Sequence, residues 1–220
     1  MERDYGVWKF SGKEKAKLIL SYLGLCGLVS WLFYHSFWAV LPFLAGLPVF
    51  LKKSREKRIK ERREELLTEF LTGIRAIASA LDAGYSMENA LGEALKETEK
   101  VYGMDGVFTE ELREMERKRN LNQSMETLWA DLGKRSGLED IENFGEIFQV
   151  ARRSGGNLKE IIQSTADNIT RKTETRREIE ISLAAKKMEQ KVMSAVPFFI
   201  LAYVDLGSPE FLEGLYHNKL

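Results

Sequence analysis

LILSYLGLCGLVSWLFYHSFWAVLPFLAGLPVFL, residues 18–51, contains no Asp, Glu, Lys or Arg. An uncharged apolar run of this length is typical of membrane-spanning segments, so we expect it to lie in lipid. Basic residues flank it on both sides: Lys13, Lys15 and Lys17 precede it, and Lys52, Lys53, Arg55, Lys57 and Arg58 follow it. Because positive charge stays on the cytoplasmic side of a membrane, both ends are expected in the cytoplasm. This requires an even number of crossings.

The simplest arrangement is a transmembrane hairpin with two passes, 18–34 and 37–51, joined at His35-Ser36. As helices the passes would span about 26 Å and about 23 Å at roughly 1.5 Å per residue, slightly less than a bilayer core of about 30 Å. Their flanks or a local thinning of the bilayer must therefore help them across. The alternative is one tilted helix over 18–40 with the remainder at the interface, which leaves one basic cluster outside.

The whole-chain composition hides a division into an apolar and a charged part. The 33 basic residues balance the 33 acidic ones, and the mean hydropathy of −0.28 would suit a soluble protein. This average combines the apolar run with a highly charged remainder that is long enough for one helical domain. No proline lies between Lys52 and Val196, which favours long helices. The single cysteine, Cys26, excludes an intrachain disulfide and a structural zinc site.

Apolar residues recur at helical spacing over 52–187 and predict an all-α cytoplasmic bundle of about six helices with charged stems. The first helix is expected to end near Gly84, which suits the left-handed position after a helix, and Ser86 suits the next N-cap. A short third helix should start at Thr109, and Asn122 is a candidate N-cap for the fourth.

Ser154-Gly155-Gly156-Asn157 predicts the sharpest turn, because Gly155 and Gly156 relieve steric limits and Asn157 can cap the following helix. That sixth helix begins at Leu158 and shows no stop before Pro197. Its middle, 171–177, is charged on every side, as in helices that are solvated or bridge two bodies. Residues 83–91 also parallel 154–162, which indicates either two related helical halves or the general likeness of helix hairpins.

These patterns predict five consecutive parts of the chain. They are a cytoplasmic N-terminal segment over 1–17, the transmembrane hairpin over 18–51, the cytoplasmic bundle over 52–187, a third transmembrane helix over 188–207 and an external tail over 208–220. The third membrane helix is expected because residues 192–204 are uncharged and follow Lys186, Lys187 and Lys191.

The ordered set of these features resembles the type II secretion F domain, in particular the short form of tight-adherence (Tad) pilus inner-membrane platform proteins. No single motif is unique to that family, but the order is fairly specific, and the resemblance covers roughly 52–209. The segments that carry it are 69–71, 83–87, 90–91, 132–136, 151–158, the stem 171–177 and Ala195-Val196-Pro197.

The resemblance implies a non-enzymatic platform, without a cofactor, in the cytoplasmic (inner) membrane of a bacterium or archaeon. It implies that the bundle contacts the assembly ATPase of a secretion or pilus machine. The membrane part would handle pilin or pseudopilin subunits, and the protein would work as a homo-oligomer or with a paralogous platform protein. The family usually ends with a fourth membrane helix. The sequence stops at Leu220, so we expect either a truncated form or a helix supplied by another chain.

Two groups of residues are the candidate functional positions. The turns, as candidate partner contacts, are Gly84, Ser86, Gly155, Gly156 and Asn157. The membrane-proximal stems contain Lys52, Lys53, Arg55, Lys57, Arg58, Arg171, Lys172, Arg176 and Arg177. The basic run over 52–63 abuts a membrane pass, so lipid headgroups explain it more simply than nucleic acid does.

Catalytic patterns are missing from the sequence. His35 and His217 are not accompanied by residues that would complete a metal site or a catalytic triad. The sequence has no Gly-x-x-x-x-Gly-Lys-Ser/Thr loop, so the chain is not itself the ATPase. The acidic clusters 110–116 and 139–146 are interpreted as solvated helix faces, with loose binding of a cation as the alternative. The alternative function is a membrane-tethered helical adaptor or signalling protein with other partners. A neighbouring gene for a secretion-type ATPase would separate the two hypotheses.

Overall fold

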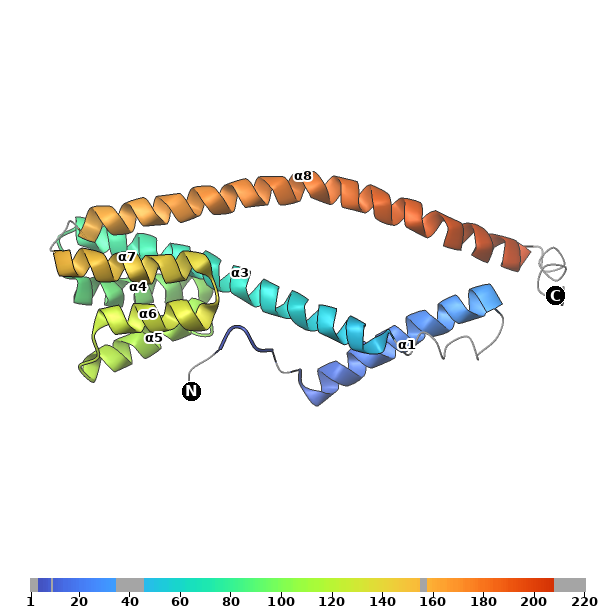
Figure 1. Cartoon of the computed structure of the whole chain (residues 1–220), viewed down its shortest axis with the longest axis horizontal. Coiled ribbons are helices and arrows are strands. Elements are labelled where there is room, and N and C mark those ends of the chain that lie inside the picture. Colours follow the sequence, from blue (N-terminus) through green and yellow to red (C-terminus); the bar gives the residue numbers. More distant parts are fainter. Residues whose placement is uncertain (1–3, 9, 35–45, 155–157, 208–220) are drawn as a thin grey trace. The chain divides into compact units, whose positions relative to one another are not determined.

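The computed structural model describes residues 4–8, 10–34, 46–154 and 158–207 (Figure 1). These residues form seven helices and no strand, which confirms the all-α prediction. The helices are α1 (Gly12–Tyr34), α3 (Leu47–Asp82), α4 (Met87–Tyr102), α5 (Val107–Asn120), α6 (Met125–Ser136), α7 (Glu139–Ser154) and α8 (Leu158–Gly207).

The chain divides into two compact units, and each is described by itself. The bundle unit comprises Met1–Trp8 and Glu56–Thr175, and the second unit comprises Lys9–Arg55 and Arg176–Leu220. Two helices pass from one unit into the other without interruption. These are α3, which crosses the boundary before Glu56, and α8, which crosses it after Thr175.

Aromatic side chains form the centre of the bundle unit. Five of them come from α3, α5, α6 and α7 and are essentially inaccessible: Phe70, Phe108, Trp129, Phe144 and Phe148. The closest pair is Trp129 and Phe144, whose ring centroids lie 4.9 Å apart at an interplanar angle of 75°. Such edge-on contacts place the positive edge of one ring against the negative face of another and stabilise the pair beyond simple burial.

Two glycines allow α6 and α7 to pack closely. A Cβ atom at Gly133 would lie 2.9 Å from the Cα atom of Glu142, and one at Gly145 would lie 3.1 Å from the carbonyl oxygen of Trp129. Any side chain at Gly133 would therefore push the two backbones apart. The sequence did not predict either contact, because each joins residues of two different helices.

The predicted helix boundaries are partly confirmed. Gly84 has a positive φ of 87°, and the Ser86 Oγ atom accepts a hydrogen bond from the Asn89 amide at 3.3 Å. Asn122 is not an N-cap: it has a φ of 64°, and Ser124 caps α6 instead. Residues 155–157, and so the predicted Gly155-Gly156-Asn157 turn, lie outside the described residues.

The third helix of the predicted bundle begins at Val107, two residues before the expected Thr109. The reason is a long-range cap. The carboxylate of Glu69 on α3 accepts a hydrogen bond from the Phe108 amide at 2.8 Å, which satisfies one of the free N–H groups at the start of α5. Glu69 is buried, and its charge lies favourably at this helix N-terminus.

Among the residues that the structure describes, no helix is both long and apolar enough to cross a membrane on its own. The hairpin over 18–51 and the membrane helix over 188–207 therefore stay predictions. The expected outer turn at His35-Ser36 and the tail over 208–220 lie outside the described residues.

Candidate functional site

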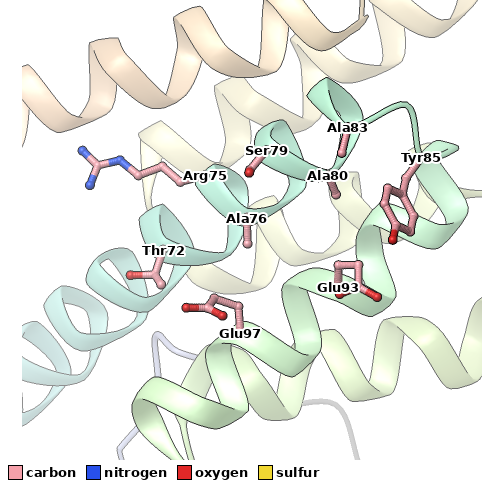
Figure 2. Close-up of a pocket in the computed structure, with 9 residues that line it drawn as sticks. All are labelled: Thr72, Arg75, Ala76, Ser79, Ala80, Ala83, Tyr85, Glu93 and Glu97. Carbon is pink, nitrogen blue, oxygen red and sulfur yellow. The ribbon is translucent and has the colours of Figure 1, made fainter.

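A cavity of about 490 Å³ lies between α3 and α4, next to the turn that joins them (Figure 2). Small side chains leave this space, because alanine and serine cannot fill the distance to α4: Ala76, Ser79 and Ala80 of α3, and Ala83 just after its end. Tyr85 of the turn lines one end, beside the predicted turn residues Gly84 and Ser86. The turn between α3 and α4 therefore lies at one end of the cavity.

The polar lining of the cavity comes from α3 and α4. Glu93 and Glu97 of α4 face the small residues of α3, whereas the guanidinium of Arg75 extends away from both carboxylates (Figure 2). Arg75 instead donates to Thr170 Oγ1 on α8 at 2.8 Å. Glu93 accepts a hydrogen bond from Lys96 at 2.7 Å. The described residues that line the cavity include no histidine or cysteine.

A second site lies at the start of the chain. We call Asp4–Trp8 the anchor segment, because Tyr5 is only 1% exposed and lies in the core of the bundle unit. The Tyr5 hydroxyl donates to Glu111 Oε1 on α5 at 2.8 Å, and the Tyr5 amide donates to the carbonyl oxygen of Arg135 on α6 at 3.0 Å. These bonds join residues more than a hundred positions apart.

An ion pair supports the Tyr5 hydroxyl. Arg135 donates to both carboxylate oxygens of Glu111, at 3.0 and 2.7 Å, and through Nε to Asp131 Oδ2 at 2.7 Å. Glu111 is 5% exposed, and these bonds offset the cost of burying its charge. Arg62 of α3 adds a cation–π contact, with its guanidinium carbon 5.0 Å from the centroid of the Tyr5 ring. Arg62, Glu111 and Arg135 together are called the anchor site below.

Burial and neighbouring charges shift the pKa values of Tyr5 and Arg135 at this site. Burial raises the pKa of the Tyr5 phenol well above its ordinary value, and the negative charge and hydrogen bond of Glu111 raise it further. Burial alone lowers the pKa of Arg135, but the hydrogen bonds and charges of Glu111 and Asp131 outweigh this, so that pKa is raised. At neutral pH the site therefore holds a neutral phenol beside a charged pair.

The sequence analysis did not predict the anchor segment, since it gives 1–17 only as a cytoplasmic N-terminal segment. The available signal was weak, namely the aromatic residues Tyr5 and Trp8. The interpretation of the acidic clusters as solvated faces is wrong at two positions. Glu111 is buried against Arg135, and Asp140 is nearly buried and accepts a hydrogen bond from Lys172 at 2.6 Å. Among the described residues no group of three or more His, Cys, Asp or Glu could hold a metal ion.

The stem residues differ in their surroundings. Lys52, Lys53 and Arg55 are exposed, and Lys57 and Arg58 each lie 3.7 Å from Glu61 of the same helix. In the other stem, Lys172 is held by Asp140, whereas Arg176 and Arg177 are exposed and belong to the second unit. The division between the two units falls within 171–177, after Thr175, and the role of this stem stays a prediction.

The chain matches the model of a known protein family. The model described as "Type II secretion system (T2SS), protein F" matches residues 74–205, which begin within α3 and end near the end of α8. Neither the curated proteins nor the solved structures give a significant match.

Proposed function

The chain belongs to the type II secretion system protein F family, and from this membership we propose that it is the inner-membrane platform of a Tad-type pilus or secretion machine. Proteins of this family are non-catalytic scaffolds of secretion or pilus assembly machinery in the inner membrane. The finer proposal is that this chain couples a cytoplasmic assembly ATPase to pilin or pseudopilin subunits. It would do so as a homo-oligomer or with a paralogous platform protein.

The observation that carries the coupling role is the continuity of α3 and α8. Each helix begins or ends in the bundle unit and continues into the second unit without a break. A helix is stiff along its axis, whereas a flexible linker is not, so a displacement of the bundle is passed along both helices. The stems contain neither glycine nor proline, which supports the same conclusion.

The membrane part of the proposal is the hairpin over 18–51 and a third membrane helix over 188–207. In α8, large apolar side chains beyond Lys191 are exposed, among them Val192, Met193, Phe199 and Tyr203. Exposed apolar side chains on this scale are suited to lipid or to partner helices. The anchor segment supports the hairpin independently. Tyr5 lies in the core of the bundle unit, which supports placing the chain on either side of 9–55 on the same side of the membrane.

The cavity between α3 and α4 is the surface that we propose for the ATPase contact. It combines a half-exposed aromatic residue, Tyr85, with the carboxylates of Glu93 and Glu97, and aromatic residues are enriched at protein interfaces. Glu97→Lys together with Tyr85→Ala should weaken ATPase copurification from membranes while the bundle stays folded. Unchanged copurification would move the ATPase contact to another face.

Rigid coupling is tested by a flexible insertion after Thr175, between the two units. A Gly-Ser insertion there keeps the Lys172–Asp140 contact and should leave the bundle folded, membrane-bound and able to bind the ATPase. Surface filaments should nevertheless be lost. The matched control is an Ala-rich helical insertion of two turns, which preserves stiffness and nearly preserves rotational phase, and should be less damaging. Normal filaments with the flexible insertion would leave only a passive docking role.

Topology is tested with single cysteines in a Cys26-free chain. A cysteine at position 36 should react with an impermeant maleimide in intact cells. One that replaces the exposed Met104 in the bundle unit should react only after lysis. Labelling of both from outside would refute the hairpin. The adaptor or signalling function would be favoured if no secretion ATPase copurifies with the wild-type chain.

A further inference from the structure

The anchor segment is a ligand of the bundle that the chain carries at its own N-terminus. Tyr5 reaches the core from outside the helical sequence of the bundle, since residues 9–55 separate it from α3 of the bundle unit. Its main chain and its side chain are both bound, through Arg135 and Glu111, which lie on different helices. Two independent bonds of this kind fix the position of the segment, which a single side-chain contact would not do.

The anchor site is shaped for an aromatic hydroxyl. Arg135 fixes both oxygens of the Glu111 carboxylate, so the carboxylate presents Oε1 to the Tyr5 hydroxyl in one orientation. Arg62 lies over the ring of Tyr5 and within 5.7 Å of the ring centroid of Trp8. The two aromatic rings therefore share one guanidinium, which couples the two ends of the segment to α3.

The segment continues directly into α1. Only residues 9–11 separate Trp8 from Gly12, where α1 begins. Trp8 and Gly12 are four residues apart and can be separated by at most about 14 Å when the chain is fully extended, so a held Trp8 restricts how far the start of α1 can move from it. α1 itself contains the first predicted membrane pass.

We propose that the anchor segment is a tether that connects α5 and α6 of the bundle to the N-terminal end of α1. A displacement of α5 and α6 then reaches the first membrane pass directly, in addition to the routes along α3 and α8. The coupling role of this tether rests on the proposed platform function. Its attachment to the bundle rests only on the contacts of Tyr5.

Attachment is measured by hydrogen exchange in the full-length protein in lipid nanodiscs. The Tyr5 amide should exchange slowly in the wild type, because it donates to Arg135. Tyr5→Ala should speed exchange of residues 4–8 by about tenfold or more, since the segment loses its buried group. Val7→Ala is the matched control, because Val7 is half-exposed, and it should leave the exchange unchanged. Equal exchange in Tyr5→Ala and wild type would overturn the attachment. If Tyr5→Ala prevents folding, Tyr5→Phe keeps the ring and should give a smaller increase in exchange.

Tethering is separated from simple support of the bundle by a flexible insertion between Phe10 and Ser11. This insertion leaves the Tyr5 contacts intact, so exchange of residues 4–8 should stay slow while filament assembly falls several-fold. Normal assembly with the insertion would overturn the tether and leave the segment as a support of the bundle alone. Failure of the wild-type chain to support filaments would instead refute the platform function, and the exchange result would still stand.

Discussion

The two halves of α8 have the same secondary structure but opposite surroundings. In the half that belongs to the bundle unit, 158–175, the apolar residues Ile162, Ala166 and Ile169 are buried. In the other half, 176–207, apolar residues such as Ile181, Val192 and Ile200 are exposed. Helix propensity therefore does not distinguish the two halves. The arrangement of apolar side chains around the helix does, because only the first half restricts them to one face.

Polar contacts mark the same boundary. Three side-chain bonds hold the first half to α3 and α7: Lys159 to Asp82 at 2.5 Å, Arg75 to Thr170 at 2.8 Å and Lys172 to Asp140 at 2.6 Å. The last of these lies just before the division after Thr175. The difference indicates that residues 158–175 of α8 are a structural element of the bundle, whereas residues 176–207 belong to the second unit.

One substitution applied to both halves should give the largest contrast. Ile162 is 1% exposed and Ile200 is 56% exposed on the same helix. Ile162→Ala should lower the free energy of unfolding of the bundle by about 2–5 kcal/mol, because it leaves a cavity in a packed core. Ile200→Ala should change it by less than about 0.5 kcal/mol. Urea unfolding of the full-length chain in detergent, followed by hydrogen exchange of α4–α7, measures both. If Ile162→Ala and Ile200→Ala lowered the free energy of unfolding equally, the two halves of α8 would share one core.

A backbone change in the bundle should loosen only the first half of α8. Gly84→Val places a β-branched residue at a φ of 87° and should cost roughly 1–3 kcal/mol of bundle stability. A Cβ atom at Gly84 meets no neighbour within 4 Å, so this cost comes from conformation and not from a clash. Gly84→Asn is the control, since asparagine tolerates positive φ better. Faster exchange in 176–207 as well as in 158–175 would contradict the division into two units.

Removing one charge tests the polar boundary. Lys172→Ala leaves the nearly buried Asp140 carboxylate without its partner and should cost about 1–2 kcal/mol. Lys186→Ala, an exposed position in the second half, is the matched control and should leave bundle unfolding unchanged. The measurement is the urea midpoint of both variants. A larger shift for Lys186 than for Lys172 would place the boundary of the bundle beyond Thr175.

The same comparison shows what the sequence could reveal. Apolar spacing located the helices of the bundle, and Gly84 with Ser86 located the first turn, because helix periodicity and capping are local properties. The cap of α5 by Glu69 and the pairing of Glu111 with Arg135 depend on residues far apart in the chain. Local sequence patterns do not predict such long-range contacts. Acidic residues on a helix are also more often solvated than buried. For the same reason the anchor segment appeared only in the structure.

The last prediction concerns the anchor, where the effect of a substitution on bundle stability depends on pH. At neutral pH, Tyr5→Phe should cost about 1–2 kcal/mol of bundle stability, because Glu111 loses a hydrogen bond. The folded state raises the pKa of Tyr5 above its ordinary value of 10.0, because burial and Glu111 outweigh the opposing charges of Arg62 and Arg135. Below pH 10 the phenol is neutral in both the folded and the unfolded chain. The wild type therefore keeps its full stability advantage over Tyr5→Phe in this range.

Above pH 10 the unfolded chain releases the Tyr5 proton and the folded chain keeps it. The wild type should then lose stability relative to Tyr5→Phe, by up to about 1.4 kcal/mol for each pH unit. The difference in the free energy of unfolding between wild type and Tyr5→Phe should therefore shrink to zero near pH 11. Urea midpoints at pH 8, 10 and 11 measure it. Other tyrosines and lysines titrate equally in both proteins and cancel in the comparison. A difference that stays constant over this range would mean that the Tyr5 phenol is not held beside Glu111, and that the anchor segment is not bound in the core.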